Sequence, residues 1–85
     1  MFQLREQELE WKRIDDEIVV LDGRASCYLS IEGSGVSLWA ALETGASREQ
    51  LVAALVDEYD IEPDRAGHDI DVFLADLAER GLLVS

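Results

Sequence analysis

The sequence predicts an α+β fold in which a three-stranded antiparallel sheet is followed by a three-helix bundle. Three short runs with strand-like patterns come first, and three runs with helical periodicity follow them. The length of 85 residues indicates one domain with one modest core. We expect residues 1–8 to form a flexible N-terminus and residues 9–85 to form the domain.

The strand predictions depend on alternation and on turn residues. Polar and apolar residues alternate from Leu9, residues 15–16 predict a turn, and residues 17–21 form a β-branched run. Asp22-Gly23 is a strong hairpin signal, because both residues tolerate positive φ. The third strand is expected over residues 26–31, with one face made of Cys27, Leu29 and Ile31 and the other of Ser26, Tyr28 and Ser30.

The first two helices have recognisable starts and stops. We expect Ser34 to cap a short helix that runs to about Thr44 and stops at Gly45. Ser47 and Gln50 match a capping box, which predicts the start of the second helix. The apolar stripe of that helix consists of Leu51, Val52, Leu55, Val56 and Tyr59.

Pro63 predicts the first turn of a third helix, and Gly81 predicts its end. Leu82 then falls where a Schellman motif would pack it on Leu77. Gly67 costs about 1 kcal/mol relative to Ala, so the first turn is expected to fray. The expected core includes Trp39, Leu55, Ile70, Phe73 and Leu77.

The charge of the chain limits its ligands. Strands followed by helices in this order are the plan of a small winged-helix domain, a shape often used to bind DNA. Nineteen acids against seven bases give a net charge of −12, which excludes that use because phosphate contacts need Lys and Arg. The sequence has no apolar run near the ~20 residues that span a bilayer and no secretory signal, which predicts a cytoplasmic protein. We therefore expect the ligand of this acidic domain to be a basic or neutral peptide.

Residues with catalytic potential are few. Cys27 is expected to be a small buried hydrophobe on its strand, and His68 has no second His or Cys at zinc-ligand spacing. Gly33-Ser34-Gly35 lacks the length and the Lys of a phosphate loop. We therefore expect a non-enzymatic protein without metal or cofactor.

A peptide-binding groove is predicted between the third strand and the third helix. Asp69 and Asp76 lie seven residues apart and share a helix face, with Val72 and Phe73 between them. A three-stranded sheet leaves an edge to which a peptide can add as another strand. The apolar helix face would receive its side chains, and the acids would attract a basic peptide.

The chain resembles the PqqD-like family, also called RiPP recognition elements, over about residues 9–84. The resemblance rests on CYLSIEGSGVSLWAAL, with its Leu38-Trp39 pair, and on the closing segment DVFLADLAERGLL. Where the family usually has Leu-Asn at the strand end, this chain has Ile31-Glu32.

The resemblance implies a non-catalytic adaptor that binds the leader segment of a ribosomally made precursor peptide. The chain looks most like the stand-alone leader-binding subunit of split lasso-peptide proteases. Its partners would then be the leader peptide, a transglutaminase-like cysteine protease subunit and the cyclase, with no nucleic acid or membrane. The leader would lie as a strand against Cys27, Tyr28, Leu29, Ser30, Ile31, Asp69, Val72, Phe73 and Asp76.

Three other interpretations stay open at this point. The resemblance also covers peptide chaperones of radical-SAM pathways, including pyrroloquinoline quinone synthesis. An acyl carrier protein is small and acidic, but Ser37-Leu38 follows Val36 rather than the Asp of the usual attachment motif. A DNA-mimicking antirepressor, or another acidic interaction domain, would explain the charge but predicts binding to a basic protein surface.

Overall fold

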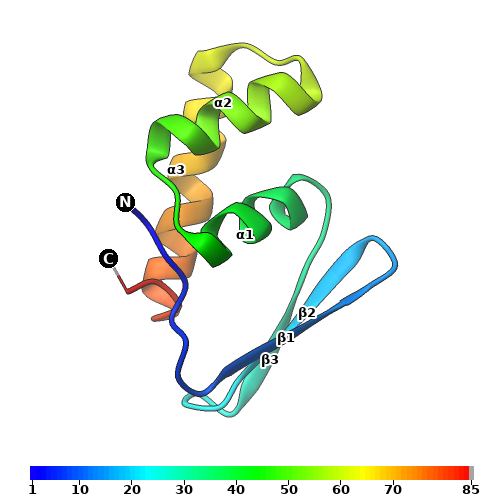
Figure 1. The fold of residues 1–85 in the computed structure, drawn as a ribbon, viewed down its shortest axis with the longest axis vertical. Coiled ribbons are helices and arrows are strands. Elements are labelled where there is room, and N and C mark those ends of the chain that lie inside the picture. Colours follow the sequence, from blue (N-terminus) through cyan, green and yellow to red (C-terminus); the bar gives the residue numbers. More distant parts are fainter. Residues whose placement is uncertain (85) are drawn as a thin grey trace.

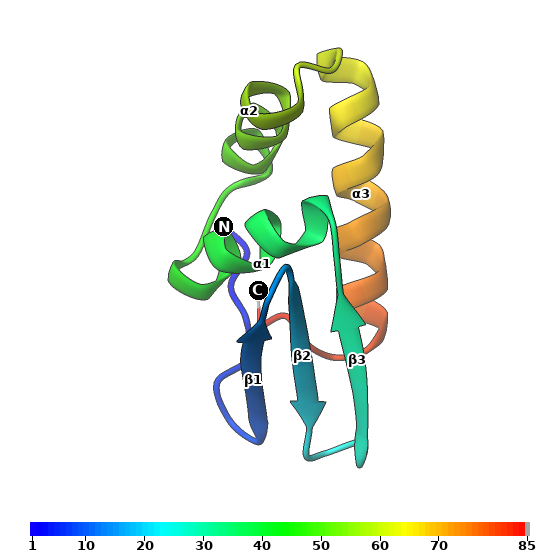
Figure 2. The same cartoon turned by 90° about the vertical axis from the view of Figure 1, so that its right-hand side faces the viewer.

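The computed structural model describes residues 1–84. Its elements are β1 (Leu9–Ile14), β2 (Glu17–Asp22), β3 (Cys27–Ile31), α1 (Ser34–Thr44), α2 (Arg48–Tyr59) and α3 (Pro63–Glu79). Neighbouring strands are antiparallel in the order β1-β2-β3, so β3 is an edge strand. The helices lie on one side of the sheet (Figure 1), and β3 is the strand nearest α3 (Figure 2). The predicted α+β fold is confirmed.

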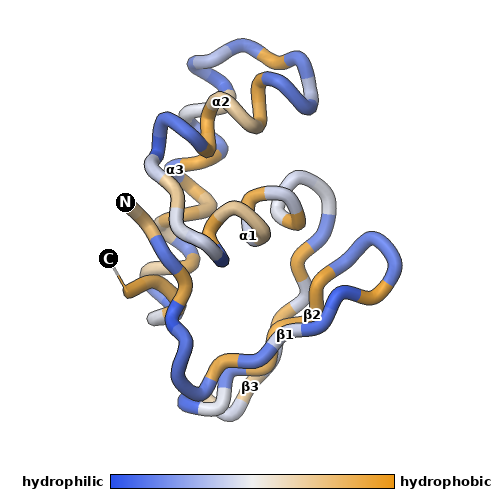
Figure 3. The backbone as a smooth tube through the Cα atoms, in the orientation of Figure 1, coloured by the Kyte–Doolittle hydropathy of each residue, from blue (hydrophilic) through white to orange (hydrophobic). Residues whose placement is uncertain are grey.

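The sheet buries the face that it turns toward α1. Hydrophobic residues recur along the strands (Figure 3), and the inward-facing Leu9, Ile18, Val20 and Ile31 are buried. Trp11 of β1 meets Trp39 of α1 edge to face, with ring centroids 5.5 Å apart and an interplanar angle of 80°. This is a preferred geometry for aromatic pairs, and it fixes α1 against the sheet.

The β2–β3 connection is shifted by one residue from the prediction, because it spans residues 23–26 and not residues 22–25. β3 begins at Cys27, and the positive φ of 53° falls on Ser26, outside the Asp22-Gly23 pair. The Asp22 carboxylate accepts hydrogen bonds from the backbone N–H groups of Arg24 at 3.0 Å and Ala25 at 3.4 Å. These bonds from an Asp side chain to the following backbone stabilise the turn.

α1 ends at Thr44 as predicted but starts one residue earlier, with Ser34 as its first helical residue. The N-cap residue is Gly33, with φ 60°, and no side chain makes a cap hydrogen bond, so the prediction that Ser34 caps the helix is wrong. Glycine adopts this backbone conformation without strain, which explains how the chain turns sharply from β3 into α1. Gly45, with φ 99°, ends the helix as predicted.

The caps of the other two helices are confirmed. Ser47 Oγ accepts from the N–H of Gln50 at 3.1 Å, and Gln50 Oε1 accepts from the N–H of Ser47 at 2.9 Å. At the end of α3, the N–H of Leu82 donates to the Leu77 carbonyl at 2.9 Å, and Gly81 has φ 74°. This six-to-one bond with a left-handed glycine is the predicted Schellman motif.

Gly67 does not interrupt α3. The helix is continuous from Pro63, and Gly67 is buried, so the prediction of a frayed first turn is wrong. A Cβ at this position would lie 2.8 Å from Arg48 Nη2 of α2. Arg48 crosses Gly67 to pair with Asp71 at 2.7 Å and 3.0 Å. The glycine therefore makes room for an ion pair that ties α2 to α3.

The core lies between the sheet and the helices. Trp39, Leu55, Ile70 and Leu77 are buried as predicted, whereas Phe73 is only partly buried. Among residues 1–84, no helix is long and apolar enough to cross a membrane.

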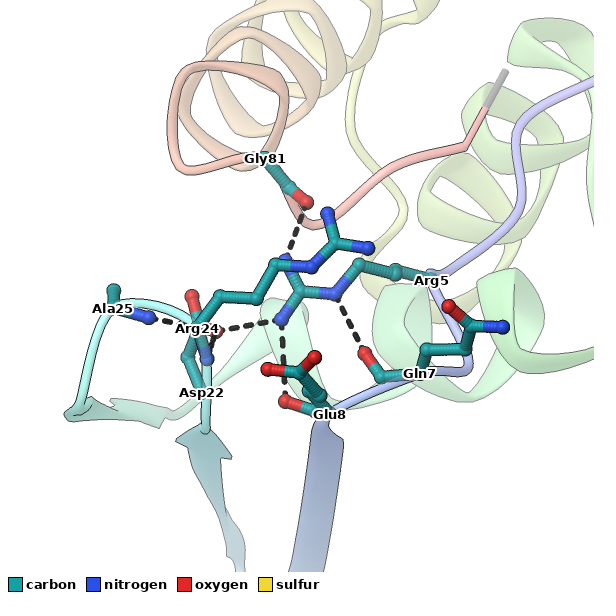
Figure 4. A network of polar contacts seen from close by, with 7 residues as sticks. All are labelled: Arg5, Gln7, Glu8, Asp22, Arg24, Ala25 and Gly81. Atoms are coloured by element: carbon teal, nitrogen blue, oxygen red, sulfur yellow. Dashed lines mark hydrogen bonds and ion pairs between the residues drawn. The ribbon is translucent and has the colours of Figure 1, made fainter.

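The N-terminal segment packs against the fold, which the prediction of a flexible stretch over residues 1–8 did not anticipate. Phe2 pairs with Ala46, and Leu4, which is 2% exposed, pairs with Leu83. Arg5 is also buried, and Figure 4 shows its guanidinium surrounded by oxygen acceptors. The segment forms a short extended stretch between α1 and the C-terminal residues.

Candidate peptide-binding groove

A groove of about 480 Å³ lies between β3, the start of α1 and the C-terminal half of α3. It follows the edge of β3 opposite to β2, which among residues 1–84 is not paired with another strand. An edge strand presents backbone N–H and C=O groups that another strand can pair with. The groove is lined by Leu29, Ser30, Ile31, Glu32, Ser34, Gly35, Leu38, Asp69, Val72, Phe73, Asp76 and Leu77.

The floor of the groove is apolar because β3 and α3 each direct apolar residues into it. Leu29 and Phe73 are partly buried, so each keeps surface available to a ligand. Gly35 allows α1 to approach this floor: a Cβ there would lie 2.8 Å from Ile31 Cγ2 and 3.5 Å from Phe73 Cε1. Any larger residue at position 35 would push Ile31 aside and change the shape of the groove.

The rim of the groove is acidic. Glu32, Asp69 and Asp76 line it, and each of them is exposed. Asp76 pairs with Arg80 at 3.2 Å on the surface of α3, which partly neutralises one carboxylate. Between the two aspartates lies Val72, an apolar side chain that is 58% exposed. A peptide with apolar side chains and flanking bases would cover the valine and pair with the acids.

Seven of the nine predicted contact residues line this groove. They are Leu29, Ser30, Ile31, Asp69, Val72, Phe73 and Asp76. Cys27 and Tyr28 do not line it. Tyr28 points to the opposite face of the sheet, because neighbouring residues of a strand alternate, and its exposed fraction is 73%.

Cys27 is exposed, so the prediction that it is a small buried hydrophobe is wrong. It shares the inner face of β3 with Leu29 and Ile31 but occupies the first position of the strand. Strand alternation correctly predicts which face of the sheet Cys27 lies on. It does not predict how far the helices extend over that face, and this decides whether Cys27 is buried. Among residues 1–84, no group of three or more His, Cys, Asp or Glu is placed to hold a metal ion.

Sequence reasoning missed the residues that close the groove at the start of α1. Glu32, Ser34, Gly35 and Leu38 all line it. The Gly33-Ser34-Gly35 turn was the available signal, because a glycine pair directly after an edge strand often marks a close approach of two backbones.

The fold and the groove together define a small winged-helix-like domain with an apolar, acid-rimmed groove along an edge strand. The chain belongs to the PqqD family: the family model described as coenzyme PQQ synthesis protein D matches residues 17–83. No curated protein sequence matches the chain.

Two solved structures are similar over nearly the whole chain. One is TbiB1 in complex with the TbiA(beta) leader peptide, which is 30% identical, with a TM-score of 0.88, over 95% of this chain and 93% of that one. The other is lasso peptide synthetase B1 complexed with the leader peptide, which is 28% identical, with a TM-score of 0.86, over 99% of this chain and 98% of that one.

Proposed function

We propose that this chain is a leader-peptide-binding protein of lasso peptide biosynthesis. It holds the leader of a precursor peptide as a fourth strand on β3 and delivers it to a partner leader peptidase. The observation on which this proposal rests is the apolar, acid-rimmed groove along the open edge of β3. Both similar structures, which have the same fold over nearly the whole chain, are complexes with a leader peptide.

The groove suits an extended peptide on energetic grounds. Strand addition supplies main-chain hydrogen bonds, each worth about 0.5–1.5 kcal/mol net. Alternate side chains of the added strand would point toward Phe73 and Leu29, and burial of one leucine-sized side chain contributes about 1.5–3 kcal/mol. Selectivity then depends on the shape of the groove floor, because backbone pairing is common to all sequences.

Val72→Arg tests the location of the groove. The new side chain would place bulk and charge between β3 and α3, so leader affinity should fall about tenfold or more. Stability should change little, because Val72 is 58% exposed. Val84 is a matched control at 57% exposure that does not line the groove, and Val84→Arg should keep wild-type affinity. Fluorescence anisotropy with a labelled leader peptide measures the leader affinity of both variants. Equal affinity of Val72→Arg and wild type would place the site elsewhere.

The proposed adaptor has no catalytic role of its own. Cys27, the single thiol of the chain, is exposed at the start of β3 and does not line the groove. Cys27→Ser should therefore leave leader affinity within about twofold of wild type, a difference below 0.5 kcal/mol. Purified chain incubated with full precursor should yield no cleaved product by mass spectrometry. Cleavage that disappears in Cys27→Ser would overturn the adaptor role.

A second candidate is a peptide chaperone for a radical-SAM pathway, which the description of the matching family model favours. The two candidate functions use the same groove and differ in which peptide binds there. Anisotropy with one lasso-precursor leader and one pyrroloquinoline quinone precursor peptide separates them. Preference for the lasso leader by about tenfold supports the first candidate.

A further inference from the structure

The two walls of the groove, β3 and α3, are not tied to each other directly. Among residues 1–84, no backbone hydrogen bond and no ion pair joins β3 to α3. A peptide strand that enters between two walls needs a defined distance between them, because backbone pairing and side-chain packing both depend on it. Other parts of the fold must therefore set the separation of β3 and α3.

The N-terminal segment is attached to the chain that follows α3. The backbone N–H of Arg5 donates to the Leu82 carbonyl at 2.8 Å, and the N–H of Val84 donates to the Gln3 carbonyl at 2.9 Å. Leu82 is fully buried and closes the Schellman end of α3, so this end of the helix is fixed in the core. Residues 3–5 thus form an extended stretch that moves with the end of α3.

The side chain of Arg5 continues from this stretch to the sheet. Its Nη1 donates to the Gly81 carbonyl at 2.9 Å, and its Nη2 donates to Asp22 Oδ1 at 2.6 Å (Figure 4). Asp22 pairs in the strand register with Cys27, the first residue of β3. One planar guanidinium, with donors in a fixed fork, therefore connects the end of α3 to the start of β3. We call these contacts of Arg5 with Asp22 and Gly81 the Arg5 brace.

We infer that Arg5 is a positioning residue for the leader site, because the Arg5 brace holds β3 and α3 at the separation at which a peptide strand fits between them. The inference rests on the proposed function and adds the residue that sets the width of the groove. Arg5 does not line the groove, so it acts through Asp22 and Gly81. Without the brace, the walls adopt several separations, and leader affinity falls in proportion to the fraction that is competent to bind.

Arg5→Lys tests the inference. Lysine keeps a positive charge beside the buried Asp22 carboxylate, but its compact ammonium lacks the planar fork that reaches both sides of the brace. Leader affinity, measured by fluorescence anisotropy, should fall about fivefold or more. Circular dichroism identifies a temperature at which each variant is folded. Asp22→Asn, which weakens the same brace from the sheet side, serves if Arg5→Lys unfolds.

Leu55→Ala is the control for a general loss of stability. Leu55 lies on α2, is 3% exposed and does not line the groove. Its truncation leaves a cavity in the core and lowers the free energy of unfolding, but it leaves the Arg5 brace intact. Leader affinity of the folded Leu55→Ala chain should stay within about twofold of wild type. Leu55→Val replaces it if the alanine variant unfolds.

A distance measurement across the groove tests the brace without any leader. Cys27, the single thiol of the chain, is exposed at the start of β3, and Glu79 is exposed at the end of α3. Nitroxide labels on Cys27 and on Glu79→Cys report the separation of the walls by double electron–electron resonance. The distance distribution should be narrow in the wild-type and Leu55→Ala backgrounds and broader in Arg5→Lys.

The outcomes separate this inference from the proposed function. If Arg5→Lys binds leader as tightly as wild type, with or without a broader distance distribution, Arg5 does not position the site and the proposed function stands. If Leu55→Ala loses as much leader affinity as Arg5→Lys, the effect is one of general stability and the inference is wrong. If wild type binds no leader, the proposed function fails and the inference fails with it.

Discussion

Arg5 connects three segments that are far apart in the sequence. Its guanidinium donates to Asp22 Oδ1 at 2.6 Å, to the Gly81 carbonyl at 2.9 Å and to the Glu8 carbonyl at 3.2 Å (Figure 4). Both side chains of the Arg5–Asp22 pair are about 5% exposed. A buried pair is expensive to break, because the remaining charge would stay desolvated. The pair thus holds the N-terminus, the β2–β3 turn and the end of α3 together.

Asp22 gives a pH prediction. The hydrogen bond from Arg5 lowers its pKa below the ordinary value of 3.8, with smaller contributions from the backbone N–H groups of the turn. A carboxyl with a lowered pKa in the folded state stabilises the fold above the unfolded pKa. That contribution is lost as the pH falls through the folded pKa. Asp22→Asn should therefore have a lower free energy of unfolding than wild type at pH 7. The difference between the two free energies should narrow from about pH 5 downward.

Urea unfolding of wild type and Asp22→Asn at several pH values measures this difference in the free energy of unfolding. Glu43→Gln, at an exposed acid of α1, is the control and should follow wild type at each pH. A gap between wild type and Asp22→Asn that stays constant from pH 6 to below the ordinary carboxyl pKa of 3.8 would contradict the assignment.

At the scale of the elements, much of the fold was predictable because the signals are local. The capping box of α2, Pro63 at the start of α3 and the Schellman end of α3 depend on residues within one turn of each other. Strand alternation likewise placed Leu29 and Ile31 on the groove side of β3. The seven groove residues came from helical periodicity together with the expectation that a peptide adds along the whole third strand.

The features that sequence reasoning missed depend on contacts between distant segments. No local pattern shows that Leu4 pairs with Leu83 or that Arg5 pairs with Asp22. Gly67 gives the same local signal whether it frays a helix or admits an arginine from another helix. The position of the Arg48 side chain against Gly67 is what distinguishes the two cases. Exposure of Cys27 similarly depends on where the helices end over the sheet.

The contact of α2 with α3 gives a prediction at Gly67. Replacing a helical glycine by alanine ordinarily stabilises a helix by about 0.5–1 kcal/mol. Here the new Cβ would displace the Arg48 guanidinium and break its pair with Asp71. Gly67→Ala should therefore gain less in the wild-type background than in Arg48→Ala, where the space is empty. Chemical denaturation of the four chains forms a double-mutant cycle; equal gains in both backgrounds would show that Arg48 does not occupy this space in solution.

At the scale of the whole molecule, the acids are not spread evenly. Nine of the nineteen acids lie between Asp57 and Glu79, in a stretch that includes all of α3 and one wall of the groove. The field of the helical half therefore attracts cations toward the site where the leader is proposed to bind.

The charge of the groove predicts how a peptide arrives. A labelled leader peptide with two flanking lysines should associate faster than its glutamine counterpart at low salt, because Asp69 and Asp76 line the groove. Salt screens exposed charges over about 8–10 Å at physiological ionic strength, so the difference should shrink as NaCl is added. In Asp69→Lys/Asp76→Lys the difference between the two peptides should shrink, because two rim acids become bases while Glu32 stays. Dissociation rates should change less, because the apolar floor around Phe73 stays intact. Stopped-flow anisotropy at several salt concentrations measures both rates; equal association of the two peptides with wild type at low salt would remove the rim acids from the binding mechanism.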